Sequence, residues 1–249
     1  MKYIGVILLC FIGFTANSQT YYKYLKPEAS SYNGFRNYDF ASFSSGISLP
    51  IGPFAGEPKD LGFHGFADNG WFAKAGMGFQ INERFSFSGM VSYSNMPVNQ
   101  QKLISYVEEI TPEKIISANT SNWQITAFYF GPTVAYSEGL YFFLFSGKLG
   151  VNGVSSPNIE MIYSDFSSER QMSQNSSIGY GFGYDLEIQM GYRFNEIFGL
   201  SLVYNYTQSM AKFENVVYDY NNGINQKIDF EETIQVSNFS LNFIFYFDN

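Results

Sequence analysis

The sequence predicts an all-β protein, an eight-stranded antiparallel up-and-down β-barrel that spans a membrane with its strands. Three observations lead to this fold class. Apolar and polar residues alternate with a period of two in eight segments, the connections between these segments are alternately short and long, and the chain begins with a secretion signal. Of its 249 residues, 20% are aromatic and only 14% are charged, whereas a typical soluble domain has about 25% charged residues.

The first 18 residues have the composition of a cleaved signal peptide. Lys2 gives a positive start, residues 3–14 form an apolar core, and Ala16 and Ser18 are the small residues that precede cleavage before Gln19. The apolar core is shorter than the roughly 20 residues of a helical membrane anchor. We therefore expect residues 1–18 to be removed on secretion.

Cleavage would also remove Cys10, the only cysteine of the chain. A lipoprotein signal is an alternative for this position, but Leu9 stands where that signal has a small residue. The mature chain then has neither a disulfide nor a thiol for catalysis or metal binding. We expect residues 19–37 to form a periplasmic segment and residues 38–249 to form the barrel domain.

The eight predicted strands are residues 40–49, 71–81, 85–94, 123–137, 140–152, 178–194, 198–207 and 239–247. The sixth reads IGYGFGYDLEIQMGYRF, with large apolar residues at every second position and glycines or charged residues between them. Short connections lie at residues 82–84, 137–139 and 195–197, and long ones at 50–70, 96–122, 155–176 and 210–233. Strict alternation places all the long connections at one end, as in outer-membrane barrels.

A soluble eight-stranded barrel of the lipocalin kind is the competing all-β interpretation, with an apolar lumen and a polar exterior. The sixth strand argues against it, because a face with three glycines and a lone Arg193 is a poor solvated exterior. An aromatic face that continues through five strands also exceeds what one small lumen can hold. Lipid outside and a polar, packed lumen suit both faces.

Aromatic residues at the strand ends predict two girdles, one at each membrane boundary. Trp71 and Trp123 each begin a strand at the long-connection end and are expected to face outward there. The girdle near the short turns is expected to contain Phe194, Phe198, Phe85 and Tyr141.

Charged residues at lumen-facing positions predict a polar network inside the barrel. The barrel is too narrow for an open pore, and opposite charges at one level in a low-dielectric wall are expected to pair. A salt-bridged plug is the expected result, and a proton or ion path is the alternative. The predicted members of this network are Lys74, Lys148, Asp185, Glu187 and Arg193.

The chain resembles the OmpA/OmpX/OmpW-like outer-membrane barrel domains, especially the porin-family form common in Bacteroidota. The resemblance rests on GISLPIGPFA at residues 46–55, AKAGMGF at residues 73–79, and the aromatic last strand. It implies the outer membrane of a Gram-negative bacterium, with loops extracellular and both termini periplasmic. Insertion by the barrel-assembly machinery and a monomeric state are also implied. Two departures are the lack of a peptidoglycan-binding domain and the extension of the chain beyond Phe247.

His64, the only histidine, is the one candidate base for catalysis. Some barrels of this kind modify lipid A, and Asp60 and Asp68 lie four residues to either side. A solvated loop histidine is the preferred interpretation, so we expect no enzymatic activity, no catalytic residue, no metal and no cofactor. The glycines of GYGFG, at residues 179–183, are expected to give room in the lumen, because no helix follows to hold a phosphate.

The four long connections hold 14 acidic and 6 basic residues, which predicts an acidic surface that does not bind nucleic acid. Divalent cations could bridge such loops to lipopolysaccharide, the expected lipid neighbour. Ile159, Met161 and Tyr163 suggest that the fifth and sixth strands extend beyond the membrane, and Tyr218 suggests an extended hairpin with a turn at residues 222–223. Edges of protruding strands could capture a surface protein by strand addition.

The function predicted from these features is a structural or surface-interaction role with a filled lumen. OmpW-like transport of small apolar molecules is the first alternative, and it predicts an apolar patch in the upper lumen and a lateral gap between strands. Phe142 and Leu144, which are expected to face inward, support it. A lipid A-modifying enzyme and a component of a secretion machine are further alternatives.

Overall fold

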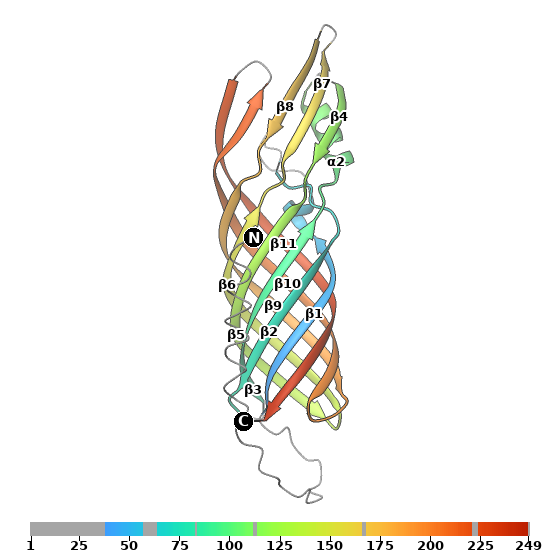
Figure 1. Cartoon of the computed structure of the whole chain (residues 1–249), viewed down its shortest axis with the longest axis vertical. Helices are drawn as coiled ribbons and strands as arrows, with labels where there is room; N and C mark the ends of the chain where they lie inside the picture. The colour runs from blue at the N-terminus through green and yellow to red at the C-terminus, as the bar shows by residue number, and fades with distance from the viewer. Residues whose placement is uncertain are drawn as a thin grey trace, which may run out of the picture. The chain divides into compact units, whose positions relative to one another are not determined.

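A computed structural model describes residues 38–56, 64–82, 84–111, 114–165, 168–220 and 224–248. The predicted signal peptide and residues 19–37 lie outside the described residues. Eight strands pair in chain order, and β1 also pairs with β11, so the antiparallel ring is closed and the predicted fold class is confirmed (Figure 1). The strands of the ring are β1 (Tyr38–Pro50), β2 (Gly70–Gln80), β3 (Phe85–Met96), β5 (Trp123–Glu138), β6 (Tyr141–Ser155), β9 (Ile178–Arg193), β10 (Phe198–Tyr220) and β11 (Ile224–Asp248).

The register of the strands sets the width of the barrel. Successive paired residues, followed around the ring from Tyr192 on β9, return to β9 at Phe182, ten residues from the start. Such a stagger requires strands tilted by roughly 35–45° from the barrel axis. Eight strands at this tilt leave an interior that side chains can fill.

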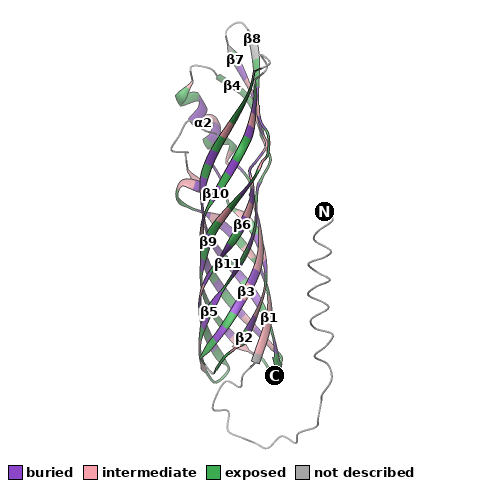
Figure 2. Ribbon diagram, turned by 90° about the vertical axis from the view of Figure 1, so that its left-hand side faces the viewer, coloured by how far each residue is buried: buried purple, intermediate pink, exposed green. Residues whose placement is uncertain are grey.

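The period-two alternation of the sequence becomes the two faces of the wall. On β9, the residues from Ile178 to Met190 alternate between exposed apolar side chains and buried small or polar ones. The same alternation marks β5, whose even-numbered residues from Gln124 to Val134 are exposed. Figure 2 shows buried and exposed residues alternating along the ribbons of the barrel. The wall is therefore apolar outside, as predicted.

All three short connections lie at one end of the barrel, here called the short-turn end. The long connections lie at the other end, where they build more structure than the sequence predicts (Figure 1). We call this structure the cap. It contains η1 (Gly52–Ala55), α2 (Gln100–Ile110), β4 (Lys114–Thr120), β7 (Ile159–Asp165), β8 (Ser168–Gln174) and the upper parts of β10 and β11. No described helix is long and apolar enough to cross a membrane.

The strands of the cap correct one prediction and agree with another. Ile159, Met161 and Tyr163 do not extend the fifth and sixth barrel strands, because they belong to a separate hairpin in which β7 pairs with β8 and β4. β8 also pairs with β10, which joins the hairpin to the barrel wall. The predicted extension of the last hairpin is present, with Tyr218 opposite Gln226, and its turn at residues 222–223 lies outside the described residues.

A hydrophobic core fills the cap where it meets the barrel. α2 contributes one face to it, with Leu103, Tyr106 and Val107 buried at helical spacing. The Asn99 side chain accepts a hydrogen bond from the backbone N–H of Lys102 and so begins the helix. The same core includes Phe54, Phe66, Met96, Trp123, Ile159, Met161, Phe213, Phe230 and Ile234. The lumen is therefore closed at this end by an ordinary protein core.

Candidate functional site

Four charged side chains from three strands meet in the middle of the lumen. Lys74 Nζ lies 2.5 Å from Glu187 Oε2, and Lys148 Nζ lies 3.4 Å from the same oxygen. Lys148 Nζ also lies 3.9 Å from Asp185 Oδ1, in keeping with the register that puts these two residues opposite each other. All four side chains are buried, and their formal charges sum to zero. We call them the ionic cluster.

Neutral polar side chains hold the ionic cluster in place. Asp185 Oδ2 accepts hydrogen bonds from Asn205 Nδ2 at 2.8 Å and from Thr207 Oγ1 at 2.9 Å. Beside the cluster, the hydroxyls of Ser88 on β3, Thr133 on β5 and Ser146 on β6 form a chain with distances of 2.8 and 2.7 Å, and Ser146 is paired in register with Glu187. Two hydrogen bonds from β10 therefore anchor the carboxylate of Asp185.

Arg193 does not belong to this cluster, which corrects the predicted set. Its guanidinium lies over the ring of Tyr246, 4.4 Å from the centroid, and donates to the carbonyl oxygens of Asn195 and Glu196. The residue is six positions beyond Glu187, at the short-turn end of β9. At about 3.3 Å per residue, that separation is roughly 20 Å along the strand, too far for an ion pair.

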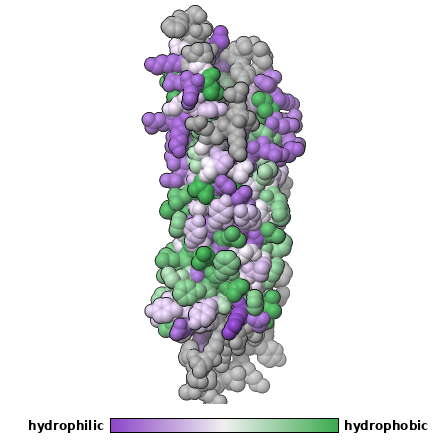
Figure 3. All heavy atoms as spheres, turned by 180° about the vertical axis from the view of Figure 1, so that it is seen from behind, coloured by the Kyte–Doolittle hydropathy of each residue, from purple (hydrophilic) through white to green (hydrophobic). Residues whose placement is uncertain are grey.

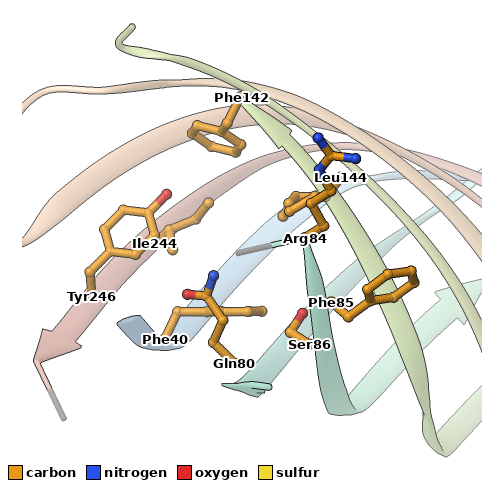
Figure 4. A pocket seen from close by; sticks show the side chains of 10 residues that line it. Phe40, Gln80, Arg84, Phe85, Ser86, Phe142, Leu144, Ile244 and Tyr246 are labelled. Carbon is orange, nitrogen blue, oxygen red and sulfur yellow. The ribbon is translucent and has the colours of Figure 1, made fainter. Parts of the chain in front are cut away.

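Below the ionic cluster the lumen is closed by apolar side chains. Phe142, Ile244 and Tyr246 are buried against one another, and Phe40 and Leu144 pack onto them. Figure 4 shows these side chains around a cavity whose edge also includes Arg84. Phe142 and Leu144 do face inward, as the sequence predicts, but they lie at the short-turn end. The transport alternative requires an apolar patch in the upper lumen, near the cap. Phe142 and Leu144 do not form such a patch, because they lie near the short turns.

Two small cavities lie in the described part of the lumen. The cavity in Figure 4 has a volume of about 30 Å³, and a second one beside Lys74, Lys148 and Glu187 has about 20 Å³. Phe40 and Leu144 line both cavities. A site for one water molecule needs roughly 10–15 Å³. Each cavity therefore has room for one or two water molecules and not for an organic solute.

Trp123 lies in the cap core and not in a girdle, so its predicted place is wrong. Its side chain is 0% exposed, and its Nε1–H donates to the carbonyl oxygen of Gly65 at 3.0 Å. The indole packs edge-on against Phe54 and Phe213, with ring centroids 5.3 and 6.1 Å apart. The strand explains the difference, since odd-numbered residues of β5 point inward while Phe128 points outward.

The other predicted girdle residues lie on the outer face. Trp71 is 50% exposed and its ring centroid is 5.5 Å from that of Tyr93. At the short-turn end, Phe194 and Phe198 stack with centroids 5.5 Å apart. Phe85 and Tyr141 are exposed near the same end. Trp71 is therefore outward-facing toward the cap, and the other four residues lie on the outer face near the short turns.

His64 is buried, which corrects its interpretation as a solvated loop residue. Its Nδ1 lies 2.5 Å from Glu232 Oε2, and its ring stacks on Phe230 with centroids 4.5 Å apart. This carboxylate partner is 168 positions away in the sequence, on β11. Asp68 instead accepts hydrogen bonds from Asn69 and Asn99, and Asp60 lies outside the described residues. The pair fastens the first long connection to β11.

Both outer strands of the cap sheet have protected edges. Along β11, the exposed residues Lys227, Asp229 and Glu231 place charges where a further strand would pair. Along β4, the carboxylate of Glu108 on α2 accepts a hydrogen bond from the backbone N–H of Ile115 at 3.2 Å. Charged edges and helix-covered edges both hinder strand addition. These features disfavour strand addition at the described edges of β11 and β4.

The glycines of β9 give room in the lumen. A Cβ atom added at Gly183 would lie 2.5 Å from Ser209 Cβ, whereas one added at Gly153 would meet only the ring of Tyr180 at 3.6 Å. We expect Gly183→Ala to lower the free energy of unfolding by about 1–3 kcal/mol through overpacking. Gly153→Ala should change it by less than about 0.5 kcal/mol, as surface substitutions do. Urea unfolding in detergent micelles, followed by circular dichroism, compares them, and equal losses would contradict the spacer role.

Comparison with known proteins gives similarity in fold without similarity in sequence. No family model and no curated protein matches this sequence. Ail, the attachment invasion locus protein of Yersinia pestis, is 11% identical, with a TM-score of 0.47 over 86% of this chain and 100% of its own. Neisserial surface protein A is 11% identical, with a TM-score of 0.43 over 84% and 97%. A major outer membrane protein from Thermus thermophilus is 11% identical, with a TM-score of 0.44 over 83% and 99%.

Proposed function

We propose that the chain is an integral protein of the outer membrane of a Gram-negative bacterium, with the cap outside the cell and the short turns in the periplasm. The observation that carries the proposal is the apolar belt on the barrel's outer face. On β9 the outward residues from Tyr184 to Phe194 are Leu186, Ile188, Met190 and further aromatic residues. On the face that Figure 3 shows, hydrophobic residues gather over the barrel and hydrophilic ones over the cap.

The height of this belt supports insertion in a bilayer. Tyr184 lies on β9, and Phe194, ten residues further along the chain, directly follows the end of that strand. At about 2.4 Å of rise per residue for a tilted strand, the belt is roughly 24 Å tall. Outer-membrane barrels have an apolar band about 25 Å tall with aromatic girdles above and below it. A soluble protein rarely exposes a contiguous apolar surface of this extent to water.

The closed lumen favours a structural or interaction role over transport. Side chains block the lumen at three levels: the apolar layer around Phe142, the ionic cluster and the cap core. We propose that the barrel is a monomeric anchor, inserted by the barrel-assembly machinery, without enzymatic activity and without a cofactor. The cap, whose connections are acidic, is the part that meets other molecules, and nucleic acid is not among them.

Orientation can be tested with single cysteines, because the only native cysteine lies in the predicted signal peptide. Ile116 is exposed on β4 in the cap, and Glu196 is exposed in a short turn. In intact cells a membrane-impermeant maleimide is expected to label Ile116→Cys and not Glu196→Cys, and both after lysis. Labelling of Glu196→Cys in intact cells would contradict the proposed orientation.

Closure of the lumen can be tested by liposome swelling. Proteoliposomes with the purified barrel are expected to swell in small sugars no faster than protein-free liposomes, because the cavities hold only water-sized molecules. Insertion is measured separately, as the fraction of barrel that remains compact on an unheated gel. Swelling by an inserted barrel would favour transport.

A surface partner can be sought separately by crosslinking from Ile116→Cys in intact cells.

A further inference from the structure

An apolar ridge continues along the outer face of β9 beyond the top of the belt. Phe182, Tyr180 and Ile178 are the next outward residues after Tyr184, and they are 65%, 73% and 61% exposed. Met210 on β10, 55% exposed, is paired in register with Phe182. We call these four residues the upper ridge. They are among the most exposed large apolar side chains in the described part of the chain.

A tyrosine pair marks the height at which the outer face becomes polar. The rings of Tyr184 and Tyr206 are 6.1 Å apart, and both hydroxyls donate to Gln208 Oε1, at 2.9 and 2.8 Å. Tyrosines with polar partners are typical of the membrane boundary. On β5 the outward residues change at a similar level, from Phe128 to the polar Thr126 and Gln124.

The upper ridge therefore stands above the hydrocarbon layer. Its residues on β9 lie two, four and six positions beyond Tyr184 on the same strand. At about 2.4 Å per residue, Phe182, Tyr180 and Ile178 are roughly 5, 10 and 14 Å higher than the tyrosine pair. If the outer face matched only the acyl chains, its apolar residues would end at the height of Tyr184 and Tyr206. On β5 they do end near that height, after Phe128. The ridge must meet something other than hydrocarbon.

The size and charge of the ridge limit what can cover it. Its four side chains expose on the order of 600 Å², below the roughly 800 Å² that each partner buries in a stable protein interface. Lys212 is paired in register with Tyr180 and is exposed, and its Nζ lies 3.6 Å from Glu214 Oε1. Both side chains of this ion pair are exposed, so it is weak and the Lys212 ammonium can exchange Glu214 for a phosphate. A cation beside amphipathic rings suits a surface that offers both phosphate groups and apolar contact.

We propose that the upper ridge binds the phosphate-and-sugar headgroup of a lipopolysaccharide molecule next to β9 and β10. The rings of Tyr180 and Phe182 lie against the sugar layer, Lys212 pairs with a phosphate, and the acyl chains follow the belt below. This inference rests on the proposed outer-membrane location. Beyond that location, it specifies the flank of the barrel, next to β9 and β10, that binds a glycolipid preferentially.

The test compares a variant that lacks two rings of the ridge with a variant that lacks a similarly exposed ring elsewhere on the outer face. Tyr180→Ser/Phe182→Ser is the ridge variant. Tyr136→Ser is the control, because Tyr136 is 62% exposed on the outer face near the short turns. Purified barrels are titrated with lipopolysaccharide in detergent micelles, and bound lipid is counted by native mass spectrometry. Two aromatic contacts and their burial should give at least about a tenfold weaker affinity in the ridge variant. The control should bind like the wild type.

Two results would overturn the inference while leaving the outer-membrane location intact. One is a ridge variant that stays inserted, as unheated gels show, and binds lipopolysaccharide as tightly as the wild type. The other is a disulfide-linked dimer formed efficiently by Tyr180→Cys in native membranes, which would assign the ridge to a second copy of the chain. A wild-type barrel that fails to insert into vesicles would instead contradict the proposed function.

Discussion

Replacing Glu187 with leucine is expected to destabilise the barrel by about 3–5 kcal/mol, the range for breaking a buried ion pair from one side. Glu187 Oε2 is the shared acceptor of the ionic cluster, 2.5 Å from Lys74 Nζ and 3.4 Å from Lys148 Nζ. Without it, two buried ammonium groups face the single carboxylate of Asp185. Urea unfolding in detergent micelles, followed by circular dichroism, measures the loss.

A second substitution separates lost charge balance from lost packing. Glu187→Leu combined with Lys74→Met removes one full pair and leaves Lys148 with Asp185, so the cluster is neutral again. Replacement of a buried pair by apolar residues of similar volume is often neutral or stabilising. We therefore expect the double variant to recover most of the lost stability. A double variant no more stable than Glu187→Leu alone would show that the pairing does not hold the lumen together.

The barrel was predictable because its signals are local. Alternation within a strand decides which residues face outward, and the length of a connection decides at which end it lies. These two rules place Lys74, Lys148, Asp185 and Glu187 at one level on inward-facing positions, and the structure brings all four together. Arg193 faces the same lumen but stands at the end of its strand, where turn carbonyls and Tyr246 are within reach.

The cap was not predictable in the same way, because its contacts join distant parts of the chain. Nothing near His64 indicates that Glu232 is its partner, and the stack on Phe230 depends on the height to which β10 and β11 rise. One signal was available in the sequence. Leu103, Tyr106, Val107 and Ile110 have helical spacing within a long connection, and that pattern predicts the amphipathic helix α2.

Trp123→Ala is expected to cost about 3–5 kcal/mol, as truncation of large buried aromatic residues does. The indole is fully buried, donates a hydrogen bond to Gly65 and contacts Phe54 and Phe213, so its removal leaves a cavity where the cap meets the barrel. Surrounding strands are held by their ladders and can collapse only partly into that space. The free energy of unfolding, measured with urea and circular dichroism, should fall accordingly.

Trp71→Ala is the matched control, because Trp71 also begins a strand at the cap end but is 50% exposed on the outer face. In micelles its loss should cost less than about 1 kcal/mol, since detergent replaces the contacts of an outward ring. Both tryptophans stand at the start of a strand in the sequence. They differ in the face of the strand on which they lie, which is the outer face of β2 for Trp71 and the inner face of β5 for Trp123. Equal losses would mean that both face the same environment, and the inward register of β5 would have to be abandoned. A large loss for Trp123 alone would confirm that Trp123 points into the cap core while Trp71 points outward.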